Sequence, residues 1–152
     1  MVVNDTPDSG KGILYNTRWA GDYRGKLEEA EKRGVCIFCL KELERSGRKF
    51  RRLDSAIMFE NEFPSKGAKI HLLIVSERHV TSPADLHLHE WMDILRMFIQ
   101  VTEEMGVDGG ALVVRFGDSD ISGATVHHLH FHLVVPKLDE RGLSTPVAFY
   151  VG

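Results

Sequence analysis

The sequence predicts an α+β domain built on an antiparallel sheet. The chain has 152 residues, a length that is typical of one domain. Hydrophobic residues make up 43% of it and charged residues 27%, which is an ordinary composition for a globular protein. Beyond residue 51, short runs rich in Val, Ile, Leu and Phe alternate with turn-forming stretches, which indicates successive strands. One long segment, residues 85–105, instead repeats its apolar residues at three- and four-residue spacing, which indicates a helix.

The first third of the chain is mostly polar. Residues 1–12 are rich in Asp, Ser and Gly, so we expect a flexible tail followed by a single domain over residues 13–152. Residues 13–34 begin with mixed apolar residues, become charged and end at Gly34, which predicts a shorter N-terminal helix. Residues 40–50 are short and charged, which favours a helical turn or a loop.

The remaining elements alternate strands with one helix. Ser82 is suited to cap the long helix, Pro83 to occupy its first position and Gly106 to end it. Residues 63–69 and 117–124 contain turn and loop residues. About five strands are predicted, over residues 52–61 (with Ile57 and Phe59 on one face), 70–77, 111–116, 125–136 and 146–151.

Charge and cysteine content exclude several classes of function. Lys and Arg number 19 against 22 Asp and Glu, so broad electrostatic binding of nucleic acid is not expected. The sequence has no apolar run approaching the ~18 residues of a membrane-spanning helix and no secretory signal at its start. The two cysteines are too few for a disulfide framework. We therefore expect a cytoplasmic protein that does not bind membranes.

Histidines are concentrated in the strand predicted near the C-terminus. His128, His130 and His132 alternate with apolar residues, so they line one face while their neighbours face the core. Burying an imidazole costs free energy unless hydrogen bonds replace its lost hydration. Three alternating histidines therefore indicate a functional site rather than a structural one. The outer pair is ~13 Å apart in an extended strand, so one metal ion shared by all three would require strong bending. A neutral imidazole is alternatively a nucleophile that can attack phosphorus.

Cys36 and Cys39 form a CxxC pair, which by itself is compatible with zinc, with thiol redox chemistry or with two buried thiols. The sequence has no βαβ unit of the kind that carries redox CxxC motifs. A structural zinc needs four ligands, and because no second CxxC exists, histidines would have to complete the set.

Residues 127–136, HHLHFHLVVP, resemble the signature of the histidine triad (HIT) family. Residues 59–64, 71–80 and 123–126 are similar, in order, to the family's ribose-binding turn, its next strand and the loop before the triad. The resemblance covers roughly residues 34–136. It implies a HIT-like fold with an antiparallel sheet, a homodimer, and hydrolysis or transfer of a nucleotidyl group at the α-phosphate of a nucleotide.

The resemblance also implies roles for individual residues. His130 would be the nucleophile that carries the nucleotidyl group, and His132 would contact phosphate and assist the leaving group. Thr125 would bind phosphate through its hydroxyl and backbone N–H. The implied nucleotide contacts are Asn61 at the ribose, Phe59 in the same segment, Thr125, His132 and Arg115.

Three departures from the family pattern accompany the resemblance. Arg115 stands where the nucleoside phosphoramidase branch usually has Asn, and Ala124 where many members have Gln. The loop between Gly117 and Gly123 is also longer than in that branch. These departures argue against simple phosphoramidase activity. Arg115 is either a source of charge for a polyphosphate substrate or an ordinary surface residue.

Zinc-containing members of the family, and the related galactose uridylyltransferases, suggest how the CxxC pair is used. Carried over, the zinc ligands are Cys36, Cys39, His79 and His128. Four protein ligands leave no open position, so this Zn²⁺ would be structural. Within the family, this combination is similar to the diadenosine polyphosphate hydrolases and phosphorylases.

The sequence thus predicts an enzyme acting on a purine nucleotide derivative such as a dinucleoside polyphosphate. One alternative is a zinc-stabilised nucleotide- or partner-binding protein with little catalysis, and another is a hydrolase that uses the triad as metal ligands. His71 is placed either near the nucleotide or in the core or surface, and His127 at a strand edge. His87 and His89 are expected in solvent.

Overall fold

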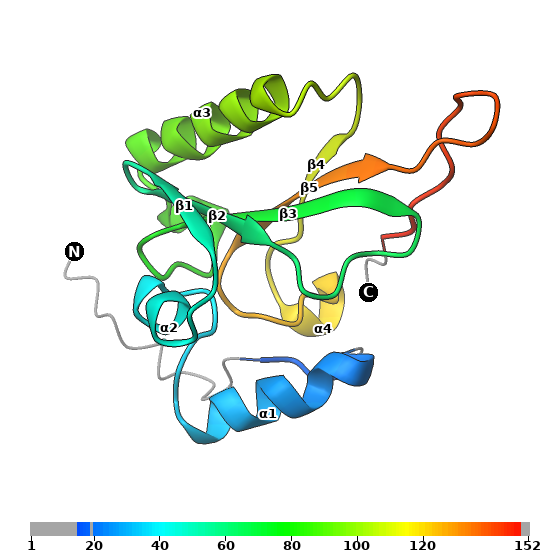
Figure 1. The fold of residues 1–152 in the computed structure, drawn as a ribbon. Helices are drawn as coiled ribbons and strands as arrows, with labels where there is room; N and C mark the ends of the chain where they lie inside the picture. The colour runs from blue at the N-terminus through cyan, green and yellow to red at the C-terminus, as the bar shows by residue number, and fades with distance from the viewer. Residues whose placement is uncertain (1–14, 19, 150–152) are drawn as a thin grey trace.

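The computed structural model describes residues 15–18 and 20–149, so the tail predicted over residues 1–12 lies outside the described residues. The predicted α+β class is confirmed. A five-stranded antiparallel sheet has the order β1-β2-β3-β5-β4 (Figure 1). The strands are β1 Phe50–Leu53, β2 Ala56–Glu60, β3 Ala68–Ser76, β4 Ala111–Val114 and β5 His130–Pro136. The helices are α1 Arg24–Lys32, α2 Leu40–Arg45, α3 Leu88–Glu104 and α4 Ser119–Ser122, with 3₁₀ turns at Gly21–Tyr23 and Pro83–Asp85.

Pairing of β3 with β5 places the histidines on one face of the sheet. Leu73 lies opposite His132, and Val75 lies opposite His130. Residues directly opposite in an antiparallel pair share a face, and side chains two apart along a strand do so as well. His71, His130 and His132 therefore belong to the same face, which we call the histidine face.

The long helix α3 covers the opposite face of the sheet (Figure 1). Its buried residues Ile94, Met97 and Val101 pack with the alternate residues of β3 and β5. Trp91 meets Phe131 edge-on, with 5.5 Å between ring centroids. After α3, Gly106 takes a left-handed conformation at φ +59°, which ends the helix as predicted. The apolar periodicity of residues 85–105 thus reflects a helix that is buried along one stripe.

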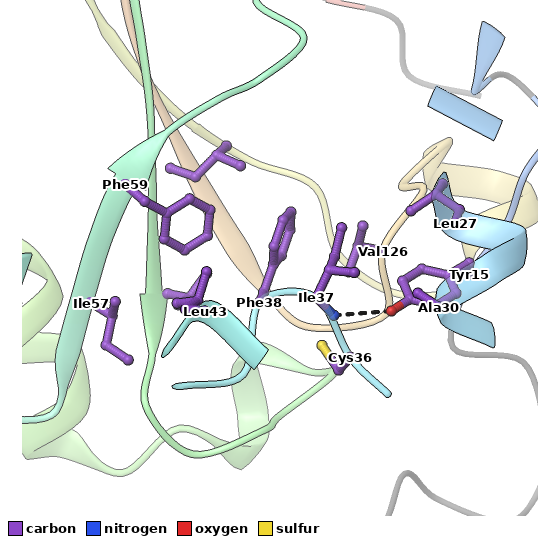
Figure 2. Packing of buried hydrophobic residues seen from close by; sticks show 12 residues of the cluster. Tyr15, Leu27, Ala30, Cys36, Ile37, Phe38, Leu43, Ile57, Phe59 and Val126 are labelled. Atoms are coloured by element: carbon purple, nitrogen blue, oxygen red, sulfur yellow. Dashed lines mark hydrogen bonds between the residues drawn. The ribbon is translucent and has the colours of Figure 1, made fainter. Parts of the chain in front are cut away.

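On the histidine face, a second apolar cluster joins the N-terminal segments to the sheet (Figure 2). Tyr15 lies at the α1 end of this cluster, beside Leu27 and Ala30 (Figure 2). Its hydroxyl accepts from the backbone N–H of Ile37 at 3.0 Å and donates to the Val35 carbonyl. Its backbone forms an antiparallel bridge with Val126. One buried residue therefore connects the CxxC loop, through its side chain, to the segment that leads into β5, through its backbone.

The structure corrects several predicted boundaries. The strand predicted over residues 52–61 is a hairpin of β1 and β2, because Asp54 turns the chain at φ +50°. The loop predicted over residues 117–124 contains the helical turn α4, whose N-cap Asp118 accepts from the N–H of Asp120. The strand predicted over 125–136 begins only at His130, and no regular strand covers residues 146–149. Among the described residues, none of the helices has the length and apolarity needed to span a membrane.

Candidate functional site

A cleft of about 780 Å³ opens on the histidine face. His130 and His132 contribute to its floor from β5, and His71 from β3. The loop after α4 adds Gly123 and Thr125, and the C-terminal segment adds residues 145–149. The cleft therefore brings together parts of the chain that are far apart in sequence, around two of the three triad histidines.

The ring of His130 is fixed by a backbone carbonyl. Its Nδ1 lies 2.7 Å from the carbonyl oxygen of His128. Since a carbonyl can only accept, Nδ1 carries the hydrogen, and Nε2 of the neutral ring keeps its lone pair. Burial lowers the pKa of His130 to about 4, and the positive charge of Arg115 acts in the same direction. At neutral pH, His130 is thus a neutral imidazole with a nucleophilic Nε2.

His132 is oriented by His71 through a chain of hydrogen bonds. The backbone N–H of Ser65 donates to Nδ1 of His71 at 3.0 Å, so Nε2 of His71 carries the hydrogen. That Nε2 lies 2.9 Å from Nδ1 of His132 and donates to it. Nε2 of His132 must then carry a hydrogen, and this buried atom meets no hydrogen-bond partner within residues 15–18 and 20–149. It is a donor held ready for a ligand in the cleft.

Burial keeps the His71–His132 pair neutral. It lowers the pKa of His71 to about 4, with a further contribution from the charge of Arg115. Burial lowers the pKa of His132 as well, helped by His130 and Arg115. A neutral pair is required for the hydrogen-bond directions described above, because a second proton on His71 would remove its acceptor for Ser65.

The other residues predicted to bind nucleotide occupy different positions. Asn61, Thr125 and Arg115 line the cleft, whereas Phe59 is 1% exposed and packs in the apolar cluster behind it. The ring of Phe59 contacts Phe38, which itself lines the cleft and meets His130 edge-on. The nucleotide contact predicted for Phe59 therefore has no support in the structure.

Two of these residues have additional roles. The guanidinium of Arg115 donates to the Gly123 carbonyl at 2.8 Å and thereby braces the loop that carries Thr125. The amide of Asn61 is oriented by the N–H of Phe63, which donates to Oδ1 at 3.0 Å. Its Nδ2 lies 3.2 Å from Nε2 of His71, but both atoms are donors, so the amide hydrogens remain for another acceptor.

A second cluster lies beside the cleft and is able to hold a metal ion. One ligand atom from each of Cys36, Cys39, His79 and His128 falls within 4.8 Å of the others. Sγ of Cys39 lies 3.3 Å from Nδ1 of His79 and 3.7 Å from Nδ1 of His128, and Sγ of Cys36 lies 3.5 Å from the latter. Zinc bonds of about 2.0–2.3 Å in tetrahedral geometry separate ligand atoms by about 3.3–3.8 Å, so the set fits zinc.

The surroundings of this cluster favour metal binding further. His128 is fully buried, and its Nε2 lies 2.9 Å from the Ser76 carbonyl, which leaves Nδ1 for a metal. The pKa of Cys39 is lowered, chiefly by the hydrogen bond from the thiol of Cys36. Burial raises the pKa of Cys36. The pair thus offers one thiolate, and a bound cation would displace the remaining thiol proton.

Some features of the site were not predicted from the sequence. The role of His71 was left open, because its partners Ser65 and His132 come from a turn and a distant strand. The C-terminal segment was predicted only as a short strand, although it lines the cleft. His87 and His89 are exposed, as predicted. They lie near Glu90, but both oxygens of Glu90 are engaged by Arg78, which disfavours a cation there.

Comparisons with known proteins agree with this geometry. The model of the HIT domain family matches residues 42–138. A histidine triad nucleotide-binding protein from Candida albicans has a similar structure, with a TM-score of 0.59 at 23% identity, covering 78% of this chain and 85% of that one. A histidine triad protein from Clostridium difficile has a TM-score of 0.53 at 26% sequence identity, and the match covers 69% of this chain and 94% of that one. A HIT family hydrolase from Clostridium thermocellum has a TM-score of 0.55 at 24% sequence identity, and the match covers 69% of this chain and 92% of that one. No match is found among curated proteins.

Proposed function

The chain belongs to the HIT domain family, and on that premise we propose that it hydrolyses or transfers a nucleotidyl group at the α-phosphate of a purine nucleotide derivative. The observation that carries this proposal is the state of His130. It is a neutral imidazole in the floor of the cleft, with Nδ1 donating to a carbonyl, and it lies outside the cysteine–histidine cluster. A histidine held in this way is suited to attack phosphorus.

In the proposed first step, Nε2 of His130 attacks the α-phosphorus in line with the leaving group. A P–N bond forms as the bond from phosphorus to the leaving group breaks, and the leaving group departs with the electron pair. The Nε2–H of His132 donates a hydrogen bond to the atom that develops this negative charge. Water or inorganic phosphate then attacks the adduct: a P–O bond forms, the P–N bond breaks, and its electron pair returns to Nε2, which releases neutral His130. When water is the acceptor, its proton passes to solvent.

The remaining cleft residues bind and orient the substrate in this proposal. Thr125 contacts the α-phosphate, and Asn61 donates its amide hydrogens to the ribose. Arg115 supplies positive charge, together with Lys66 and Lys137, which line the same cleft. Three cations exceed what one phosphate requires, which favours a dinucleoside polyphosphate substrate.

We also propose that Cys36, Cys39, His79 and His128 hold a structural Zn²⁺. The donor distances and the second hydrogen bond of His128 support this assignment. With four protein ligands, the ion would bind no reacting group, and it would fix the CxxC loop to the start of β5. His130 follows two residues later, so the ion would stabilise the backbone carbonyl that orients the nucleophile.

A homodimer is proposed from two surfaces of the fold. β4 is an edge strand that pairs only with β5 among the described strands. The side of α3 away from the sheet exposes four apolar residues at helical spacing, Leu88, Met92, Leu95 and Ile99. A second copy of the chain would cover this apolar stripe.

The direct test is product analysis with a panel of diadenosine polyphosphates and adenosine phosphoramidates, with and without inorganic phosphate. The proposal predicts release of a mononucleotide by wild type and loss of turnover in His130→Asn, with nucleotide affinity largely retained. Equal turnover by wild type and His130→Asn would contradict the proposed mechanism. Nucleotide binding without turnover by either protein would instead favour a binding protein with little catalysis.

A further inference from the structure

The C-terminal segment is anchored so that it returns over the cleft. After β5, the N–H of Lys137 donates to the Gly67 carbonyl at 2.9 Å. An antiparallel bridge between Leu138 and Ser144 reverses the chain, and the N–H of Thr145 donates to the Lys137 carbonyl at 2.8 Å. Figure 1 shows this hairpin, in orange to red, leaving the end of β5 and returning beside the turn before β3. We call residues 145–149 the strap.

The strap passes very close to the turn before β3. Gly67 lies at φ +89°, and a Cβ atom at this position would be 2.5 Å from the carbonyl oxygen of Pro146. A residue with a side chain would therefore push the strap away. The close approach fixes the path of the chain from Pro146 onward, toward the histidines.

At the end of the strap, Phe149 rests on the two hydrogen-bonded histidines. Its ring meets His132 edge-on, with 5.2 Å between centroids and an interplanar angle of 72°. It meets His71 in the same way, at 5.7 Å and 60°. The aromatic ring thus forms a wall of the cleft directly beside the pair that holds the Nε2–H of His132 in place.

We propose that Phe149 is a positioning residue, which shields the His71–His132 hydrogen bond from water and so keeps His132 directed at the leaving group. This inference rests on the proposed function. Water that reached the pair would compete for the 2.9 Å hydrogen bond and would stabilise a protonated, cationic His71. Loss of the hydrogen bond or protonation of His71 would each leave Nε2 of His132 no longer held as a hydrogen-bond donor that faces the cleft.

The charged groups around the pair, like the proposed shielding, favour the neutral form of the two histidines. Arg115 lowers the pKa of both His71 and His132, and His130 lowers that of His132. Lys66 and Lys137, which line the same cleft, are also cationic. Ser65 and Asn61, which contact His71, do not titrate. Loss of the phenyl ring should therefore be visible as a rise in the pKa of His71.

The first test is independent of catalysis. NMR titration of the histidine rings in the full chain should give His71 a pKa of about 4 in wild type. In Phe149→Ala this pKa should rise by about one unit or more, because the ring no longer excludes water. Phe149→Leu, which keeps apolar volume, should stay close to wild type. Leu143→Ala, in the same hairpin but 55% exposed, is the matched control and should have no effect.

The second test separates positioning from binding. On diadenosine tetraphosphate, Phe149→Ala should lower kcat about tenfold and change KM less than about twofold, with recovery in Phe149→Leu. An unchanged His71 pKa in Phe149→Ala would overturn the inference, as would an effect confined to KM. An increase in kcat would also overturn it and would identify the strap as inhibitory. If wild type turned over no nucleotide, the proposed function would fail, but the NMR titration would still decide whether Phe149 shields the pair.

Discussion

His130 and His132 differ in role because their ring nitrogens have different neighbours. Nδ1 of His130 meets a carbonyl oxygen and becomes a donor, whereas Nδ1 of His132 meets the N–H of His71 and becomes an acceptor. The Nε2 atoms consequently differ: one has a lone pair and the other a hydrogen. In the proposed mechanism, two identical side chains two residues apart therefore take opposite roles, nucleophile and hydrogen-bond donor.

At this scale, we expect the free energy of unfolding to decrease as the pH falls from about 7 to about 4. The pKa of His71 is about 4 in the folded chain and about 6.5 when unfolded. Between these values, the unfolded state binds a proton that the native state does not. The contribution of neutral His71 to the free energy of unfolding is therefore fully present above the pKa of the unfolded state. It is lost as the pH falls toward the pKa of the folded state, by about 1.4 kcal/mol per pH unit.

Urea denaturation across this range measures the effect, with His71→Gln as the comparison. Gln can still accept from Ser65 and donate to His132, but it does not titrate. The variant should therefore show a weaker dependence of the unfolding free energy on pH. Identical pH dependence in both proteins would show that His71 is not held neutral.

Residues that carry a local pattern could be predicted from the sequence, and others could not. The triad and the CxxC pair have fixed spacings, so they were recognisable in one dimension. His71 and Phe149 became part of the site only through β3–β5 pairing and the return of the strap. Phe59 was predicted in the site because it lies in the same segment as Asn61. It does lie on the histidine face, opposite Leu73, but it packs in the apolar cluster against Phe38, and Phe38 lines the cleft instead.

At the scale of elements, the cysteine–histidine cluster joins three parts of the chain. The CxxC loop precedes α2, His79 follows β3, and His128 precedes β5. The apolar cluster around Tyr15 and Phe38 also packs the CxxC loop against the sheet. A bound ion would add a second link between this loop and the segments that carry His79 and His128.

Removal of the ion with a chelator should destabilise the fold, by about 3 kcal/mol or more, because binding to the native state contributes directly to stability. Thermal denaturation with and without chelator measures this shift. Cys36→Ser should have a low melting temperature that chelator lowers no further. His130→Asn is the matched control, since it should keep its metal and its melting temperature while losing turnover. Loss of activity on chelation with an unchanged melting temperature would indicate a catalytic ion instead.

Elements with strong periodicity were predicted to within a few residues. The predicted segments 70–77 and 85–105 correspond to β3 and α3, where long apolar patterns dominate the local preferences. The hairpin of β1 and β2 was missed because a two-residue turn at Asp54 interrupts an otherwise strand-like run. β5 is shorter than predicted because the segment before it turns toward the cysteine–histidine cluster and Tyr15 rather than pairing with β3.

At the scale of the whole molecule, the sheet separates two functions. The histidine face carries the cleft and the cysteine–histidine cluster, and the opposite face is covered by α3. The outer side of α3 and the edge strand β4 are the surfaces that we assign to a second copy of the chain.

Met92→Glu and Ile99→Glu should each shift the protein from dimer to monomer, because a carboxylate on the apolar stripe would be desolvated at the interface. Sedimentation velocity at several concentrations measures the change. Leu143→Glu, also at an exposed apolar residue but on the C-terminal hairpin, should remain dimeric. A wild-type protein that sediments as a monomer at all concentrations would exclude the proposed interface.

The proposed mechanism requires a covalent bond between His130 and a nucleotidyl group. Rapid acid-free quenching during turnover of a diadenosine polyphosphate, followed by peptide mass spectrometry, can locate that bond. We predict a single nucleotidyl adduct on Nε2 of His130, which is absent in His130→Asn and accumulates when the second acceptor is limiting. Sustained turnover with the adduct on another residue, or with none formed, would contradict the central role of His130.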